Sequence, residues 1–252
     1  MKRRLRLIAL AGAILAVLGA GFILAEPAVA QEININLGQG NTLTARIIQL
    51  VALITVLSLA PSILIVVTSF TRIIVVLSLL RSALGVQQTP PNTVLISLAL
   101  FLTAFIMAPT FQKAYTDGVS PFMDEKIEAP DAFQKTVEPF KDFMLAHVRE
   151  KDLNLFLQMS KTPPPADPTA TPLQVLIPAY LISELNRAFE IGFLIFVPFV
   201  VIDMIVASIL MSMGMMMLPP VMISLPFKLI FFVLVDGWNL VAGSLVKGFG
   251  IG

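Results

Sequence analysis

The feature that most constrains this chain is a pair of long apolar blocks that carry a few isolated charges and prolines. The first block runs from about residue 47 to 108, and the second from 191 to 246. Hydrophobic residues make up 57% of the chain and charged residues 13%, against about 25% charged residues in an average soluble domain. A water-soluble globule of 252 residues could not hide so much apolar surface. The sequence therefore predicts burial in a membrane or in a larger assembly.

The composition also excludes several classes of function. The net charge is +1 and no basic tract follows the first six residues, so no nucleic-acid partner is expected. The chain has no cysteine and a single histidine, His147, and it lacks the phosphate-binding loop and metalloprotease motifs. Asp203 and Asp236 could be imagined as an intramembrane aspartyl pair, but their neighbours do not resemble such proteases. We therefore expect no enzyme, no cofactor and no bound metal.

The first 30 residues have the pattern of a secretory signal peptide. Four basic residues precede an uncharged run from residue 7 to 24, and Ala28-Val29-Ala30 then provides small residues for a signal peptidase. The pattern predicts that residues 1–30 are removed between Ala30 and Gln31, and the alternative is an uncleaved membrane anchor. The mature chain would begin on the outer face of a bacterial cytoplasmic membrane.

The mature chain divides by composition into three regions. Residues 31–110 form an N-terminal hydrophobic helical block, and residues 191–252 form a C-terminal hydrophobic helical block. Between them, residues 111–190 hold 12 acidic and 8 basic residues, and this polar helical region is expected to face the periplasm. The alternation of hydrophobic and polar regions predicts a multi-pass protein of the bacterial inner membrane.

We predict an all-α protein whose hydrophobic segments are broken helices or helical hairpins. These helices are expected at about 47–71, 94–108, 191–217 and 221–246. Arg72 and Arg81 would lie in or near the connection after the first helix. The second helix has only 15 residues, about 22 Å against a hydrocarbon core of about 30 Å. Because prolines and embedded charges such as Asp203 and Lys228 are costly in lipid, the helices are expected to pack against other protein.

The polar region is expected to bury a small helical core. One predicted helix face carries Phe133, Val137, Phe140, Met144 and Val148. Pro139 would lie inside this helix or open a new one, and Asp152 is expected to cap the next helix. Pro178 is expected to open a helix that runs into the second apolar block. Because so small a hairpin buries a limited core, we also expect Phe143 and Phe156 to pack against a neighbouring subunit.

Half of the methionines gather in one stretch of the second apolar block. Six of the 12 fall within twelve residues, at positions 211, 213, 215, 216, 217 and 222. Three of them are consecutive and stand between Gly214 and a Leu-Pro-Pro sequence, where helical structure should break. Methionine is apolar, unbranched and adaptable, so the stretch predicts a deformable hydrophobic constriction rather than an ordinary helix interface.

Two long blocks of the sequence are distinctive. The first runs from Pro61 to Asn92 and reads PSILIVVTSFTRIIVVLSLLRSALGVQQTPPN. The second begins at Ile177 with IPAYLISEL and continues through MMMLPP at 215–220 to DGWNL at 236–240. These blocks resemble the signature regions of the FliP family of flagellar type III export-gate proteins. With the signal peptide and the acidic middle region, the resemblance covers nearly the whole mature chain.

The resemblance implies a pore-forming subunit of the export gate at the centre of the flagellar basal body. Family members assemble as a homo-oligomeric ring with FliQ and FliR, usually with the help of FliO, and cooperate with FlhA and FlhB. Unfolded rod, hook and filament proteins pass through this gate, and the energy comes from the proton motive force and a separate ATPase.

The resemblance also implies roles for individual residues. The pore gasket would consist of Met215, Met216 and Met217. Charges at subunit interfaces or within the structure would be Arg149, Glu184, Lys228 and Asp203. Ion pairs within or between subunits are expected there, although the sequence leaves the pairing open, and for Arg149 a solvated side chain is the alternative.

Three other functions fit parts of the pattern. The equivalent subunit of a virulence injectisome would have the same fold, but those relatives usually lack a cleaved signal peptide. An ion channel or secondary transporter would line a narrow path with polar residues, whereas the methionine stretch suits a seal better than a selectivity filter. A scaffold that nucleates the basal-body rod is compatible with every feature above, and an export gate could perform both tasks.

Overall fold

The computed structural model describes residues 43–86, 88–161, 163, 165, 167–215 and 217–250. The predicted signal peptide with its Ala30–Gln31 cleavage site lies outside this part, and so does Met216. Every regular element in the described part is a helix, which confirms the all-α prediction. The chain divides into two compact units, residues 1–54 and 55–252, and the helix contacts below lie within the second.

The helices follow one another with short connections. The α-helices are α2 (Leu43–Val67), α3 (Phe70–Leu84), α4 (Asn92–Ala114), α5 (Ser120–Met123), α6 (Ala129–His147), α7 (Glu150–Met159), α8 (Leu173–Ser212), α9 (Pro220–Leu234) and α10 (Gly237–Lys247). A π-helical turn, η1 (Tyr115–Val119), joins α4 to α5, and a 3₁₀ turn, η2 (Pro168–Ala170), precedes α8.

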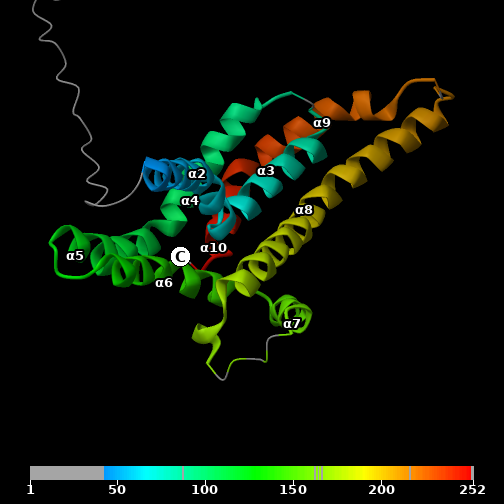
Figure 1. The fold of residues 1–252 in the computed structure, drawn as a ribbon. Coiled ribbons are helices and arrows are strands. Elements are labelled where there is room, and N and C mark those ends of the chain that lie inside the picture. The colour runs from blue at the N-terminus through cyan, green and yellow to red at the C-terminus, as the bar shows by residue number, and fades with distance from the viewer. Residues whose placement is uncertain are drawn as a thin grey trace, which may run out of the picture. The chain divides into compact units, whose positions relative to one another are not determined.

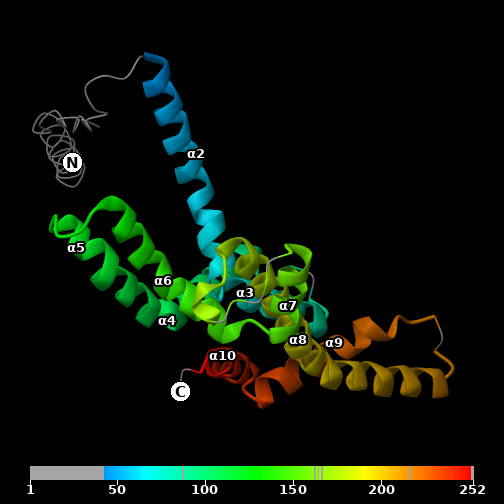
Figure 2. The same cartoon turned by 60° about the horizontal axis from the view of Figure 1, so that its bottom comes forward.

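Helix α3 lies at the centre of the second unit. Its buried side chains recur every three or four residues and are apolar apart from Arg72. This face packs against α8, and α4 and α9 also contact α3 (Figures 1 and 2). One buried cluster joins α3 to α4, α8 and α10, and it contains Ile73, Val76, Leu77, Leu95, Ala99, Ile106, Ala188 and Leu245. A charged side chain on this central helix therefore needs a partner inside the protein.

The end predicted for the first hydrophobic helix is wrong. Helix α2 stops at Val67 instead of about residue 71, and Arg72 and Arg81, expected in or near a connection, lie in the helix α3. The hydroxyl of Tyr180 on α8 donates a hydrogen bond to the carbonyl of Thr68 at 3.0 Å. The Thr68 carbonyl, which lies in the break between α2 and α3, thus has a hydrogen-bond partner on α8. The break is therefore stabilised by tertiary structure.

Helix α4 is longer than the expected 15-residue segment at 94–108. It continues through Pro109 to Ala114 and then joins η1 and α5. The end of α4 and the turn η1 pack against α6, which lies beside α4 in both views (Figures 1 and 2). Packing thus compensates for the backbone hydrogen bond that a proline removes. The whole stretch Asn92–Met123 has 32 residues and is long and apolar enough to cross a membrane, so the prediction of a short span is wrong.

Helix α8 is one continuous element of 40 residues, although it contains Pro178 and Pro198. It starts at Leu173 rather than at Pro178, and it runs without interruption from the polar region into the second apolar block. At 1.5 Å per residue it is about 60 Å long, twice the thickness of a hydrocarbon core. Helix α9 returns beside the distal part of α8 and forms a hairpin with it (Figure 1).

Two helices in the described part meet the length and hydropathy of a membrane span. They are Asn92–Met123 and Leu173–Ser212, and the number rises to four if each of two bent helix pairs counts as one span. One bent pair is α9 with α10, whose axes meet at 61°. The prediction of helical hairpins and broken hydrophobic helices therefore agrees with the fold.

The middle of the polar region forms α6 and α7. Helix α6 contains Pro139 in its interior and buries Met144, whereas Phe133 on the same predicted face is 70% exposed. Helix α7 begins at Glu150, and Asp152 lies in its first turn instead of capping it. The expected cap is wrong because the helix begins before Asp152, and Arg149 occupies the N-cap position.

Candidate functional site

The most deeply buried charges among the described residues form an ion pair between α3 and α8. Arg72 donates from Nε to Oε2 of Glu184 at 2.8 Å and from Nη2 to Oε1 at 2.5 Å. The side chains are 2% and 0% exposed. This two-point geometry satisfies both carboxylate oxygens, which is what a buried pair requires to offset its desolvation.

Arg72 also holds the C-terminal end of the described chain. Its Nη1 donates to the carbonyl of Gly248 at 3.1 Å, and its guanidinium lies 3.7 Å from the centre of the Phe249 ring. A cation over an aromatic face is attracted by the ring quadrupole, more strongly when both are removed from water. One side chain on α3 therefore joins α8 to the segment that follows α10.

A second ion pair joins the two helices of the α8–α9 hairpin. Lys228 Nζ lies 2.7 Å from Oδ2 of Asp203, and the hydroxyl of Ser224 donates to Oδ1 of the same carboxylate at 2.5 Å. Lys228 also donates to the carbonyl of Ala83 at the end of α3, at 3.4 Å. The two charges embedded in apolar sequence thus satisfy one another and fix α9 against α8 and α3.

A third polar cluster joins α7 to α8. Arg149 Nε lies 2.7 Å from Oδ2 of Asp152, and Ser183 Oγ donates to the same oxygen at 2.7 Å. Burial alone raises the pKa of Asp152, but the hydrogen bonds from Arg149 and Ser183 outweigh it, and the pKa falls below its ordinary value. Arg149 also reaches Glu190 at 3.4 Å, so its side chain is paired rather than simply solvated.

The methionine stretch spans the end of α8, the turn that follows it and the start of α9, at the end of the hairpin (Figure 1). Gly214 has a φ of +74°, a left-handed conformation that glycine adopts freely and that ends α8. Met215 is 43% exposed and Met217 is 99% exposed. Met213, Leu218 and Met222 are also exposed, so several apolar side chains are uncovered together at this end of the hairpin.

The two phenylalanines singled out in the polar region differ in their surroundings. Phe143 is half-buried, and its ring stacks on Phe249 at 5.9 Å between centroids and meets the His147 ring at 4.5 Å. Phe156 on α7 is also half-buried. Part of Phe143 is therefore used inside its own chain, and packing of either ring against a neighbouring subunit stays a prediction.

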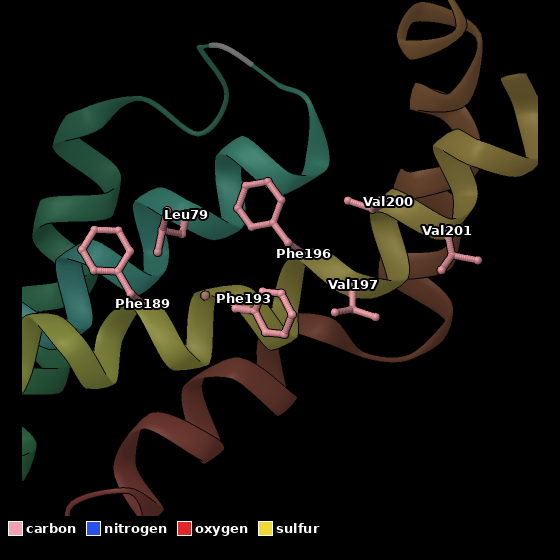
Figure 3. Close-up of a pocket in the computed structure, with 8 residues that line it drawn as sticks. Leu79, Phe189, Phe193, Phe196, Val197, Val200 and Val201 are labelled. Carbon is pink, nitrogen blue, oxygen red and sulfur yellow. The ribbon is translucent and has the colours of Figure 1, made fainter.

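An apolar hollow of about 490 Å³ runs along α8 and is lined by Leu79, Phe189, Gly192, Phe193, Phe196, Val197, Val200 and Val201. Figure 3 shows Leu79 of α3 facing the row of phenylalanines on α8. Gly192 permits this approach, because a Cβ there would collide with the Leu79 side chain. The lining has no ionisable group to orient a small ligand, and the described residues contain no group of three metal-ligating side chains.

A model of the FliP family matches residues 53–245 of the chain. The chain belongs to the FliP family. A flagellar biosynthetic protein FliP of Caulobacter vibrioides is 64% identical over 228 residues, covering 90% of this chain and 86% of the relative. One of Bacillus subtilis is 56% identical over 202 residues, covering 80% and 91%. One of Aquifex aeolicus is 48% identical over 235 residues, covering 92% and 96%.

For this member of the FliP family, the structure supplies the partners that the sequence left open. Glu184 meets Arg72, Lys228 meets Asp203, and Arg149 meets Asp152. Arg72 was not predicted as a site residue, although an arginine inside an apolar run is a signal that could have found it. Ser183 and Ser224 complete two of the clusters, and nothing in a lone serine reveals such a role in sequence.

Proposed function

We propose that this chain is a pore-forming subunit of the flagellar type III protein export gate. Family membership supports the general role, because the FliP relatives are named flagellar biosynthetic proteins. The type III export role follows from the family, and a member is a structural component of the export apparatus rather than an enzyme.

The observation that carries the pore role is the exposed methionine turn at the end of the α8–α9 hairpin. One copy leaves Met215 partly uncovered and Met217 almost fully uncovered. Several copies around an axis would bring these turns together with Met216 into a collar of thioether side chains. Such a collar excludes water and ions because it is apolar, and it yields to an extended polypeptide because methionine has several accessible rotamers.

The hairpin beneath the turn is suited to hold such a collar. The Lys228–Asp203 pair joins α9 to α8, and the bond from Lys228 to Ala83 ties both helices to α3. Pulling the two helices apart would leave an unpaired charge in apolar surroundings, which costs several kcal/mol. Opening is therefore assigned to side chains and backbone of the turn, with the hairpin remaining closed.

The proposal extends to location and partners. Two to four hydrophobic segments cross the bacterial inner membrane, and the polar region from 111 to 190 faces the periplasm. The chain assembles with further copies of itself and with FliQ and FliR, receives help from FliO, and works with FlhA and FlhB. Its clients are exported flagellar proteins of the rod, hook and filament.

A clean deletion of the gene tests the function. We expect hook and filament proteins to disappear from the culture supernatant and motility to be lost, with both restored by the intact gene. Flagella that persist while another secretion system fails would instead indicate an injectisome subunit. If both systems persist, the export role is wrong, and flux of small solutes through the chain becomes the question to measure.

A further inference from the structure

The corner between α9 and α10 carries a carboxylate that has no partner among the described residues. Asp236 connects the two helices with a φ of +51°, and its side chain is exposed. It makes no salt bridge and no side-chain hydrogen bond to any residue in the described part of the chain. The other acidic residue of the second apolar block, Asp203, is fully engaged by Lys228 and Ser224.

The surroundings of Asp236 are apolar and equally uncovered. Val233 is 76% exposed, Leu234 80% and Leu240 59%. Beside them lies an apolar hollow of about 430 Å³ between α8, α9 and α10, whose lining includes Val235 and Gly237 on either side of Asp236. We call Asp236 together with this hollow and the three exposed side chains the corner surface.

We infer that the corner surface binds an apolar helix of a different chain that places a lysine or arginine on Asp236. The inference rests on the proposed function, since it presumes a complex of several chains. The hollow accepts apolar side chains, whereas the carboxylate at its edge is costly against lipid or apolar protein unless a cation pairs with it. The occupant must therefore combine an apolar face with one basic group.

A second copy of this chain is a poorer source of that cation. Inside the two apolar blocks the basic residues are Arg72, Arg81 and Lys228. Each is already bonded in its own copy, to Glu184, Asn92 and Asp203 respectively. Outside the blocks a second copy could offer Lys113, Arg187 or Lys247, so an adduct with a second copy is one outcome of the test, and Lys247 at the end of α10 supplies an arm of it.

The backbone at residue 236 allows a clean removal of the charge. After glycine, asparagine and aspartate are the residues that tolerate the left-handed conformation best. Asp236→Asn therefore keeps the shape and the conformation of the corner and deletes only the negative charge. Asp131→Asn removes an exposed acid from the polar helix α6 and serves as the matched control.

The test uses the full-length chain expressed in its own bacterium with p-benzoyl-phenylalanine at position 234. Complexes are irradiated in cells, extracted in mild detergent, and the adducts are mapped by mass spectrometry. We expect an adduct with a chain of different sequence, within one helical turn of a lysine or arginine. Asp236→Asn should reduce its yield at least about tenfold, because truncating one partner of a buried charge pair raises the dissociation rate. Asp131→Asn and Lys247→Ala should leave the yield unchanged.

Other outcomes overturn the inference in distinguishable ways. Adducts with lipid alone or with a second copy of this chain would reject the inference about the corner surface. So would an adduct yield that is the same in Asp236→Asn as in the parent, in an otherwise intact complex. Each of these outcomes leaves the proposed function standing. A wild-type chain that extracts without any other chain rejects both proposals. The same label at position 133, on exposed α6, reports whether Asp236→Asn has disturbed the fold elsewhere.

Discussion

Arg72 and Glu184 lie 112 residues apart in the chain and form a two-point ion pair with both side chains buried. The pair connects the central helix α3 to the long helix α8 inside an apolar core. Removing one partner would leave the other charged and unpaired, whereas removing both would leave only a change of shape. The loss of stability from an unpaired buried charge can therefore be compared with the loss from changed packing.

Glu184→Ala is expected to destabilise the protein by about 3–5 kcal/mol, because it leaves the guanidinium of Arg72 buried without a counter-charge. The double variant Arg72→Met with Glu184→Leu should recover most of that loss. The measurement is the midpoint of thermal unfolding of the detergent-purified chain. Glu190→Ala, which removes a carboxylate that is 64% exposed, is the control and should change stability by less than about 1 kcal/mol. A double variant as unstable as Glu184→Ala would argue that packing, not charge, is what the site needs.

Replacing the methionines at 215, 216 and 217 by alanine is expected to leave the complex assembled but permeable to small ions. Alanine lacks the flexible thioether that fills an irregular opening. The readout is ion conductance of cells that express the variant. Met159→Ala on α7, where the methionine is 68% exposed, provides a matched control away from the hairpin. Unchanged conductance in the triple variant would rule out the gasket.

Gly192→Ala is expected to be destabilising because the new Cβ would collide with Leu79 across the α3–α8 contact. Overpacking of this kind typically costs about 1–3 kcal/mol. Adding Leu79→Ala should relieve the collision, at the cost of a cavity. Gly243→Ala is the matched control, since a Cβ there meets no atom within 4 Å and the better helix propensity should stabilise α10 slightly. Equal effects of the two glycine variants would contradict the close contact.

Stability is expected to depend on Asp152 at acidic pH. The folded pKa of this group is below its ordinary value of 3.8, so the unfolded chain takes up the proton first as pH falls. The stabilisation is therefore complete above the unfolded pKa and disappears as pH falls through the lower, folded pKa. Unfolding midpoints measured between about pH 6 and pH 2 should fall less steeply in Asp152→Asn than in the parent. Parallel curves would mean that the cluster with Arg149 and Ser183 does not hold the carboxylate.

The helical class and the hairpin character followed from the sequence because they depend on local composition. Apolar runs interrupted by prolines and charges cannot be simple lipid-facing helices, and the fold resolves this through internal packing around α3. The methionine turn was likewise visible, since Gly214 and the prolines at 219 and 220 stop helices by their backbone geometry.

The partners of the buried charges and the ends of the helices could not be predicted from local composition. The interruption after Val67 is stabilised by Tyr180, which lies 112 residues away from Thr68. The length of α4 depends on α6, which supports the helix beyond Pro109. Such features arise from contacts between distant segments, and one sequence contains no record of which segments meet.

The continuity of α8 has a mechanical consequence. The polar cluster at Ser183 and the methionine turn after Ser212 lie on one rigid rod, about 44 Å apart along its axis. A tilt of about 5° at the cluster would carry the turn sideways by about 4 Å, by the geometry of a lever of that length. A small movement of α7 that tilts α8 at this cluster would therefore displace the methionine turn by a larger distance.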